Sequence, residues 1–395
     1  MIKDRYLRAS IASDLKDKMV FVGGPRQVGK TTLARLIGES EYKKFAYLNW
    51  DSREDRRVIL EGAFQAEAGL VIFDEIHKYK KWKNYIKGEF DKYKEKFNII
   101  VTGSARLDLY RKGGDSLMGR YHYYRLHPFS TAEALGMRPE IAVLKTLKFP
   151  EHFDGKNALS KTFSDLLTFG GFPEPFINKN QKTLRRFQNE RLDRLIKEDI
   201  RDIEQIRDIS ALQVLVEILP AKVGSLLSLN ALREDMQVSH KTISAWMDVL
   251  ERFYYHFRIY PYKTSIVKSL RKEPKMYLWD WSQVVDRSAR LENMVASHLL
   301  KTAHFLYDTE GYKAELNFLR DVDGREADFF VTVDKKPWFA VEVKSSERAA
   351  SKHLIYFVKK LKIPFAYQLV NEHEADYWQD NIRIISADKF LGGLV

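Results

Sequence analysis

The stretch Gly24-Pro25-Arg26-Gln27-Val28-Gly29-Lys30-Thr31 decides how the N-terminal part of this chain folds. It matches the phosphate-loop pattern G-x-x-x-x-G-K-[ST] at every position. An apolar run, Met19-Val20-Phe21-Val22, precedes the loop, and good helix formers follow it in residues 32–37. Such a loop works between a strand and a helix N-terminus, where backbone N–H groups and the helix dipole hold phosphate. The sequence therefore predicts a strand, a loop and a helix that together bind a nucleoside triphosphate.

The contacts expected with the nucleotide come from this loop and from the start of the following helix. Lys30 is placed to reach the β- and γ-phosphates, and the Thr31 hydroxyl is placed to ligate Mg²⁺. The residues expected at the nucleotide are Gly24, Pro25, Gln27, Val28, Gly29, Lys30, Thr31 and Thr32. ATP and Mg²⁺ are the cofactors that this pattern implies.

A second element of the nucleotide site is the run Leu70-Val71-Ile72-Phe73-Asp74-Glu75. Four consecutive apolar residues are typical of a strand buried on both faces of a parallel sheet. Two acids at its carboxyl end would face the crevice where ligands bind in such sheets. Asp74 would then hold Mg²⁺ through water, and Glu75 would orient and polarise the attacking water. The alternative is a strand that ends in two solvated acids, but the phosphate loop favours the catalytic interpretation.

A third apolar run, Asn98-Ile99-Ile100-Val101, ends in small polar residues. Either Thr102 or Ser104 could place a hydroxyl near the γ-phosphate. The alternation of strands with helical segments predicts a three-layer α/β domain with a parallel sheet. Further along the chain, Arg120 is a lone arginine after a helical segment. It is either an arginine supplied to a γ-phosphate, often by a neighbouring subunit, or part of a surface salt bridge.

Composition limits the class of protein. A chain of 395 residues is expected to form two to four domains, and 45% hydrophobic residues are enough to build their cores. The absence of cysteine excludes disulfides and thiolate metal sites. No apolar run reaches about 18 residues, and the first residues lack an apolar signal core, so we expect a cytoplasmic protein that does not enter a membrane. The net charge of +12 favours polyanionic partners but is spread along the chain.

Residues 19–135 resemble an AAA-type ATPase of a large and mostly uncharacterised bacterial and archaeal group. The matching segments are GGPRQVGKTTLA (23–34), LVIFDEIHKYKKW (70–82), IIVTGSARL (99–107) and SLMGRYHYYRLHPFSTAEAL (116–135). In that group a Gly-Arg pair recurs where Gly119-Arg120 stands here, which favours Arg120 as a γ-phosphate sensor or finger. His77 replaces a more usual glutamine, at a position expected to lie outside the chemistry. The resemblance implies a homo-oligomer, and a hexamer is the assembly that it suggests.

The middle of the chain carries no legible chemistry. Residues 136–207 are expected to form a helical lid or linker, and residues 208–285 resemble a winged helix. Ser239 is a good N-cap for a helix that begins at His240 and lies where a recognition helix would lie. Such modules either read DNA in the major groove or serve as protein contacts. This helix carries few basic residues, which weakens the DNA interpretation. Both possibilities remain open.

A second group of polar residues lies near the C-terminus. The run from Glu326 to Val333 alternates, a turn follows, and the strand Phe339–Lys344 returns. A hairpin centred near Lys335 would put Asp328 directly opposite Glu342. Because like charges in that position are destabilising, we expect Mg²⁺ or Mn²⁺ to bridge the two carboxylates. Lys344 would then project beside the metal, where it could stabilise a phosphate or hold the attacking water.

Upstream, Glu292 is expected near the apolar face of a helix and could be a further carboxylate of the metal site. Glu292, Asp328 and the tripeptide Glu342-Val343-Lys344 resemble the PD-(D/E)XK nuclease fold over residues 286–395. The C-terminal domains of the ATPase group often resemble this nuclease. The alternative is a structural ion pair between Glu342 and Lys344 or Glu326, on a fold that has lost activity.

These expectations combine into one hypothesis. The chain is expected to hold an AAA-type ATPase core (1–135), a helical lid (136–207), a winged-helix module (208–285) and a nuclease-like α/β domain (286–395). Its expected function is ATP hydrolysis coupled to metal-dependent cleavage of nucleic acid, with DNA favoured. The alternative is a nucleotide-switched regulator that binds DNA or protein and uses an inert nuclease-like domain as a scaffold.

Overall fold

A computed structural model of the chain describes residues 4–64, 68–103, 107, 117–150, 158–200, 208–262, 273–344, 349–372 and 374–395. Of the predicted site residues, Ser104 lies outside the described residues. The chain divides into two compact units. The N-terminal unit comprises Met1–Pro128 with Arg252–Tyr254, and the C-terminal unit comprises Phe129–Glu251 with Tyr255–Val395.

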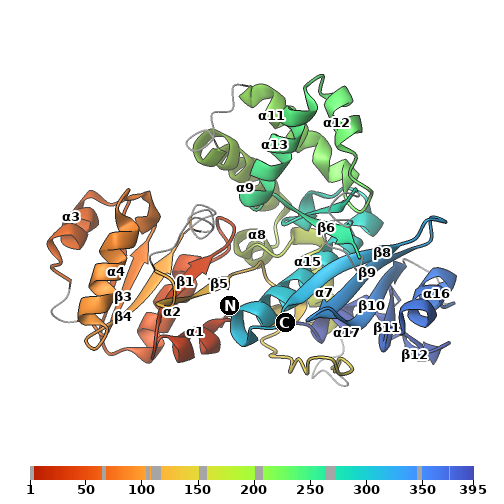
Figure 1. Cartoon of the computed structure of the whole chain (residues 1–395), viewed down its shortest axis with the longest axis horizontal. Helices are drawn as coiled ribbons and strands as arrows, with labels where there is room; N and C mark the ends of the chain where they lie inside the picture. The colour runs from red at the N-terminus through yellow and green to blue at the C-terminus, as the bar shows by residue number, and fades with distance from the viewer. Residues whose placement is uncertain are drawn as a thin grey trace. The chain divides into compact units, whose positions relative to one another are not determined.

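The N-terminal unit is built on a five-stranded parallel sheet with the strand order β2-β3-β4-β1-β5 (Figure 1). The strands, in chain order, are β1 Met19–Gly23, β2 Phe45–Asn49, β3 Leu70–Asp74, β4 Asn98–Thr102 and β5 Tyr121–Arg125. Every residue of β1 and of β3 is buried, as expected for strands covered on both faces. The predicted parallel sheet is therefore confirmed.

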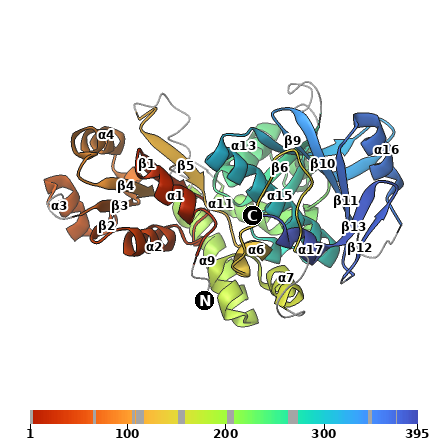
Figure 2. The same cartoon turned by 90° about the horizontal axis from the view of Figure 1, so that it is seen from below.

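Helices cover both faces of this sheet. The helices of the unit are α1 Arg8–Asp14, α2 Lys30–Glu41, α3 Arg53–Glu61 and α4 Trp82–Tyr93, with a short 3₁₀ turn η1 at Ile76–Lys78. Figure 2 shows α2 and α4 on opposite sides of the strands. Alternate strand residues such as Phe21 and Phe73 pack with Trp82 and Ile86 of α4 in one buried cluster. The three-layer α/β architecture predicted from the sequence is present.

The C-terminal unit is built on an eight-stranded mixed sheet with the order β12-β13-β11-β10-β9-β8-β6-β7. Its strands are β6 His256–Pro261, β7 Lys275–Leu278, β8 Ala314–Arg320, β9 Glu326–Val333, β10 Lys336–Lys344, β11 Phe365–Val370, β12 Asp376–Gln379 and β13 Ile382–Ser386. The strands β8, β9 and β10 form an antiparallel meander, and β10 then pairs with β11 in parallel. The helix α16 Lys352–Leu361 makes that crossover, and Leu354 and Phe357 of α16 pack on Phe330 and Ala340 of the sheet.

The other helices of this unit lie before the meander. They are α6 Thr131–Ala134, α7 Ala158–Phe169, α8 Pro173–Asn178, α9 Gln181–Arg194, α11 Ile209–Ile218, α12 Leu229–Asp235, α13 His240–Arg252 and α15 Arg287–Glu310, with α17 Ala387–Gly392 at the end of the chain. The unit also contains a short π-helix, η2 Leu195–Ile200, and two short 3₁₀ helices, η3 Leu219–Lys222 and η4 Trp281–Gln283. The long helix α15 begins at the side-chain cap Asp286 and ends at Gly311, which has a φ of 77°.

The segment predicted as a winged helix is organised differently from the expectation. Helices α11, α12 and α13 are present, and Ser239 caps α13 by accepting a hydrogen bond of 3.0 Å from the Thr242 N–H. The two strands that follow, β6 and β7, pair with each other, but β6 also pairs with β8 through Tyr260 and Asn317. These strands therefore form the edge of the C-terminal sheet rather than a separate wing. Residues 129–251 and 255–395 belong to one compact unit.

Candidate functional site

The phosphate loop joins β1 to α2 through a backbone that requires glycine at two positions. Gly24 has a φ of 138° and Gly29 has a φ of 98°. A Cβ atom on Gly24 would lie 2.4 Å from the carbonyl oxygen of Leu126, so this position has no room for a side chain. Gly29 is the N-cap of α2 and no described side chain caps this helix end. The first N–H groups of α2 therefore remain for an anion.

Lys30 lies over this loop rather than in solvent. Its ammonium donates to the carbonyl oxygens of Gly24 (3.0 Å) and Pro25 (2.7 Å), and the residue is buried. The side chain of Lys30 thus keeps its positive charge inside the loop, at the place where phosphate oxygens are expected. Gln27 of the same loop has a positive φ of 61°. Thr32 lies on the first turn of α2, and its side chain is exposed.

Arg5 is a part of this site that the sequence analysis missed. Its guanidinium donates to the carbonyl oxygen of Val28 in the loop (2.7 Å) and to that of His127 after β5 (2.6 Å). Arg5 is buried, and it ties the loop to the neighbouring edge of the sheet. No sequence pattern indicates these two bonds, because each is made to a backbone carbonyl group.

The Asp74 carboxylate connects three side chains of the nucleotide site. Its Oδ2 accepts hydrogen bonds of 2.8 Å from the hydroxyls of Thr31 and Tyr47, and its Oδ1 accepts one of 2.6 Å from Thr102. Thr102 at the end of β4 is one of the two hydroxyl residues that the sequence placed here. Burial, together with the bond to Asp74, raises the pKa of Tyr47, so this phenol remains a hydrogen-bond donor. Carboxylate and hydroxyl oxygens in contact are a donor set that suits Mg²⁺.

Glu75 follows Asp74 in a left-handed backbone conformation, with a φ of 56°. Its N–H donates to the carbonyl oxygen of Thr102 over 3.0 Å, which fixes the backbone of Glu75 at the end of β4. Its Oε2 lies 3.3 Å from Lys78 Nζ and 3.6 Å from His77 Nε2. The sequence interpretation placed His77 outside the chemistry, but the buried imidazole of His77 lies directly beside Glu75. The local reason is the 3₁₀ turn η1, which folds these residues back onto Glu75.

Arg120 lies far from the phosphate loop of its own subunit. It precedes β5, and its carbonyl oxygen accepts a hydrogen bond from the Met19 N–H at the start of β1. The phosphate loop follows the other end of β1, at Gly23. The guanidinium of Arg120 forms a two-point ion pair with Asp91 of α4, with distances of 2.7 and 3.1 Å. In the single chain Arg120 is therefore engaged in the surface pair that was the alternative interpretation.

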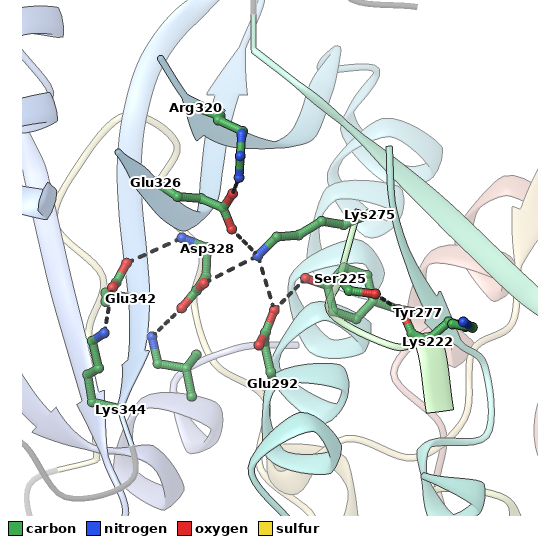
Figure 3. A network of polar contacts seen from close by, with 11 residues as sticks. Lys222, Ser225, Lys275, Tyr277, Glu292, Arg320, Glu326, Asp328, Glu342 and Lys344 are labelled. Carbon is green, nitrogen blue, oxygen red and sulfur yellow. Dashed lines mark hydrogen bonds and ion pairs between the residues drawn. The ribbon is translucent and has the colours of Figure 1, made fainter. Parts of the chain in front are cut away.

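The C-terminal polar residues come together around four carboxylates, Glu292, Glu326, Asp328 and Glu342, which we call the acid cluster (Figure 3). Beyond its turn, the hairpin β9–β10 pairs Val341 with Phe329, which continues to Glu342 opposite Asp328. The Asp328 N–H donates to Glu342 Oε2 (3.3 Å), and Asp328 Oδ2 accepts from the Val343 N–H (2.9 Å). The expected apposition of the two acids is thus present.

A bulge in β10 produces this apposition. Next to the turn, Val333 pairs with Lys336, and this register alone would place Asp328 opposite Val341. The pairing shifts by one residue between Pro337 and Phe339. Because side chains alternate between faces, the shift brings Glu342 to the face of Asp328. The extra residue, Trp338, is buried and donates from Nε1 to the carbonyl oxygen of Lys145 (2.8 Å).

The sequence analysis did not anticipate Lys275, which enters the acid cluster from β7. Its ammonium lies 2.7 Å from Glu326 Oε1, 3.4 Å from Asp328 Oδ1 and 3.5 Å from Glu292 Oε1. Figure 3 shows these three carboxylates arranged around the lysine nitrogen. The residue is buried, with 3% of its surface exposed. The cation that compensates these acids is thus supplied by the chain itself.

Electrostatics within the acid cluster follow from burial and charge. Burial, followed by the charge of Asp328, raises the pKa of both Glu292 and Glu342 well above the usual range of a glutamate. Burial alone would lower the pKa of Lys275, but the carboxylates of Glu292, Asp328 and Glu326 reverse this effect and raise it. Lys275 is therefore charged at neutral pH, whereas Glu292 and Glu342 retain protons more readily than exposed acids.

Other side chains complete the environment of the cluster. The Tyr277 hydroxyl donates to Glu292 Oε1 over 2.7 Å, and Arg320 Nη1 lies 2.7 Å from Glu326 Oε2. Lys344 Nζ lies 3.2 Å from Glu342 Oε1, in the ion pair that was considered as the structural alternative. Gly224 approaches Glu292 so closely that a Cβ atom there would lie 3.2 Å from the carboxylate oxygens.

The acid cluster does not fit a divalent metal as it stands. Among the described residues, no three acidic or histidine side chains converge as a metal site requires. Asp328 turns one oxygen toward Lys275 and the other toward the backbone of β10. The metal that the sequence predicted between Asp328 and Glu342 therefore has a competitor, the ammonium of Lys275.

Comparison with known families assigns the N-terminal part of the chain. Residues 16–135 match the family described as AAA domain. Residues 160–286 and 287–390 match two families described as domains of unknown function, DUF8612 and DUF4143. The chain thus carries an AAA-type ATPase domain with a P-loop core, followed by two regions whose families have no assigned activity.

Individual relatives are distant. MJ1544, an uncharacterized protein of Methanocaldococcus jannaschii, is 24% identical over 369 residues, which cover 88% of this chain and 80% of the relative. MJ1637 of the same organism is 25% identical over 294 residues, which cover 66% and 60%. Among solved structures, the RuvB Holliday junction branch migration motor of Thermotoga maritima is 17% identical, with a TM-score of 0.31 over 64% of this chain and 87% of that protein.

Over the part of the chain that the structure describes, no helix has the length and apolar character needed to span a membrane.

Proposed function

We propose that the chain hydrolyses ATP at the phosphate loop of the N-terminal unit. The observation that carries this proposal is the contact between the Thr31 hydroxyl and the Asp74 carboxylate, 2.8 Å apart, beside the buried Lys30. These groups come from two segments that are 43 residues apart in the chain. Their convergence at the carboxyl edge of the parallel sheet is what a triphosphate with a bound Mg²⁺ requires.

Each residue of the site then has a role. Mg²⁺ supplies positive charge to the phosphate oxygens when the nucleotide is bound. Lys30 exchanges its loop carbonyl partners for phosphate oxygens, while Thr31 and Asp74 hold the ion. Glu75, the residue after Asp74, orients and polarises the attacking water. Thr102 keeps the Asp74 carboxylate in place through its bond of 2.6 Å.

Arg120 contributes to a neighbouring subunit in this proposal. It precedes β5, beside the start of β1, whereas the phosphate loop follows the opposite end of β1, and this position supports a role at the nucleotide of another subunit. A guanidinium delivered from the next subunit stabilises the charge that develops on the transferred phosphate. The active form is accordingly a homo-oligomer, and a hexamer is the assembly suggested by the resemblance to AAA-type ATPases.

The direct test is a comparison of wild type with Lys30→Ala. The wild-type protein is expected to bind ATP and release phosphate in the presence of Mg²⁺. Lys30→Ala is expected to lose both nucleotide binding and turnover, while circular dichroism and thermal unfolding show that it is folded. Retention of ATP binding by the folded variant would contradict the assigned site.

For the C-terminal unit we infer a regulatory role, which the structure supports better than a nuclease activity. In this form, ATP binding changes how the protein engages DNA or a protein partner, and the nuclease-like domain is a scaffold. The supporting observation is Lys275, whose ammonium is already ion-paired with three of the four carboxylates of the acid cluster. The net charge of +12 supports a polyanionic partner such as DNA.

A second candidate function is metal-dependent cleavage of nucleic acid, with DNA favoured. It is supported by the apposition of Asp328 and Glu342, by Lys344 at 3.2 Å from Glu342, and by the order α15, β8, β9, β10, α16, β11. Glu292 completes the set of residues that the resemblance to PD-(D/E)XK nucleases implies. In this form Mg²⁺ or Mn²⁺ has to displace the ammonium of Lys275.

One experiment separates these two forms. The protein is incubated with plasmid and single-stranded DNA, with Mg²⁺ or Mn²⁺, in the presence and absence of ATP. The regulatory form predicts intact DNA and an ATP-dependent change in DNA or partner binding. Cleavage by wild type that is abolished in Lys344→Ala, with ATP hydrolysis unchanged, would instead establish the nuclease.

A further inference from the structure

The position of Lys275 is the feature of the C-terminal unit that the resemblance to a nuclease does not explain. An ammonium group has three N–H donors, and three carboxylates lie around it: Glu326, Asp328 and Glu292 at 2.7, 3.4 and 3.5 Å. The lysine nitrogen therefore lies between these three carboxylates and holds them around itself. A divalent cation bound by the same oxygens would need the same space.

The backbone holds Lys275 in this place. Lys275 is part of β7, where it pairs with Ile259 of β6 on one side and forms a bridge with Leu226 on the other. The backbone of Lys275 is thus fixed between β6 and the segment at Leu226. Its ammonium also lies 5.8 Å from the centre of the Phe318 ring, close enough for a favourable cation–π contact. The lysine is a built part of the cluster and not a surface side chain that happens to reach it.

We propose that Lys275 is the permanent cation of the acid cluster and that it keeps divalent metal ions out of it. This inference goes beyond ATP hydrolysis, and it explains why the C-terminal unit would act as a scaffold. Removal of the lysine charge leaves Glu292, Asp328 and one oxygen of Glu326 without their shared cation, while Arg320 and Lys344 stay paired with Glu326 and Glu342. Such a group of hard oxygen ligands is what Mg²⁺ and Mn²⁺ bind. A single substitution at position 275 should therefore create a metal site.

The test is a titration of the nucleotide-free, full-length protein with Mn²⁺, followed by electron paramagnetic resonance of the unbound ion. Lys275→Met keeps most of the length of the side chain, since it is shorter by one atom, and removes its charge. This variant is expected to bind one Mn²⁺ at least 10-fold more tightly than wild type. Addition of Asp328→Asn to Lys275→Met should abolish this binding, and Lys275→Arg, which keeps the charge, should behave like wild type. Addition of Mn²⁺ should raise the Tm of Lys275→Met and should leave the Tm of wild type and of Lys275→Arg unchanged.

A buried charge cluster that loses its cation can fail to fold, so a charge-balanced variant is included. Lys275→Met with Glu326→Gln removes one cation and one anion, which leaves the net charge of the cluster unchanged. It retains Glu292, Asp328 and Glu342 as ligands and is expected to bind Mn²⁺. The proposal is overturned if wild type binds Mn²⁺ in a way that Asp328→Asn abolishes. It is also overturned if the folded Lys275→Met or charge-balanced variant binds Mn²⁺ no better than wild type.

Discussion

The hydroxyl of Thr31 donates a hydrogen bond of 2.8 Å to the carboxylate of Asp74, which links the first turn of α2 to the end of β3. The same carboxylate accepts bonds from Tyr47 and Thr102, so three strands and one helix fix its orientation. A carboxylate held in this way needs little reorganisation to hold a hydrated Mg²⁺. This contact is the basis of the first prediction.

Asp74→Asn should lower ATP turnover by about 10- to 100-fold, because an amide keeps the shape of the carboxylate and loses its charge toward Mg²⁺. Turnover is measured by phosphate release at saturating ATP, and ATP affinity is measured separately. Asp51→Asn is the matched control, since the Asp51 carboxylate is exposed and pairs with Lys78. Equal turnover of Asp74→Asn and wild type would remove Asp74 from the site.

Arg5→Ala should destabilise the N-terminal unit by about 2–4 kcal/mol and weaken ATP binding, because two buried charge-assisted bonds are lost, one to the Val28 carbonyl of the loop and one to the His127 carbonyl after β5. Arg5→Lys should rescue only part of the loss, since one ammonium cannot reproduce the fork of the guanidinium. Chemical denaturation and ATP titration measure the two effects. Arg8→Ala is the control on the same N-terminal segment. An unchanged ATP affinity of Arg5→Ala would mean that the phosphate loop binds ATP without its hydrogen bond to Arg5.

Arg120→Ala and Lys30→Ala should each be inactive alone and recover activity when mixed. In a mixed oligomer, a subunit with an intact phosphate loop can receive Arg120 from its Lys30→Ala neighbour. Specific activity of the wild type should also rise with protein concentration as subunits assemble. The absence of recovery in mixtures that demonstrably exchange subunits would assign Arg120 to the Asp91 ion pair alone.

The stability of the C-terminal unit should fall in mild acid because of His298. Its Nδ1 lies 2.7 Å from the carbonyl oxygen of Met294, and its Nε2 accepts from the Thr131 N–H at 3.0 Å, so the imidazole is neutral. Burial lowers the pKa of His298 from 6.5 to about 3. Below pH 6.5 His298 becomes protonated in the unfolded chain but stays neutral in the folded chain.

The free energy of unfolding should therefore decrease as the pH falls through this window, by up to about 1.4 kcal/mol per pH unit for this residue. Denaturant unfolding between pH 7 and pH 4 measures the slope. His298→Asn should make the slope smaller by the contribution of His298, while the buried His256, whose pKa is lowered by burial to about 4, keeps its own contribution. Replacement of the exposed His353 should leave the slope unchanged. An identical slope in His298→Asn and wild type would show that the imidazole is not the group responsible.

Much of the nucleotide site could be predicted because its chemistry is local in sequence. The loop from Gly24 to Thr31 and the strand that ends in Asp74 each carry a complete pattern, and a parallel sheet brings their ends together. Arg5 and Tyr47 could not be predicted in the same way. Arg5 binds backbone carbonyls, and Tyr47 is one tyrosine among 20 with no pattern around it.

The C-terminal cluster shows a different limit of sequence reasoning. The apposition of Asp328 and Glu342 was expected from a simple hairpin, but it depends on the bulge at Trp338, which no periodicity predicts. Lys275 lies 53 residues from Asp328 in the chain and reaches it only because β6 and β7 join the sheet. The sequence analysis assigned these strands to a separate wing and therefore had no reason to bring a lysine into the cluster.

The measurement that tests the central claim most directly is ATP binding and steady-state ATP hydrolysis by Glu75→Gln beside wild type. The substitution keeps the size of the side chain and removes the carboxylate that is proposed to polarise water. We expect Glu75→Gln to bind ATP within a few-fold of wild type and to hydrolyse it about 100-fold or more slowly, so that ATP remains trapped on the protein. Turnover by Glu75→Gln at the wild-type rate would contradict the assignment of Glu75 as the group that polarises the attacking water.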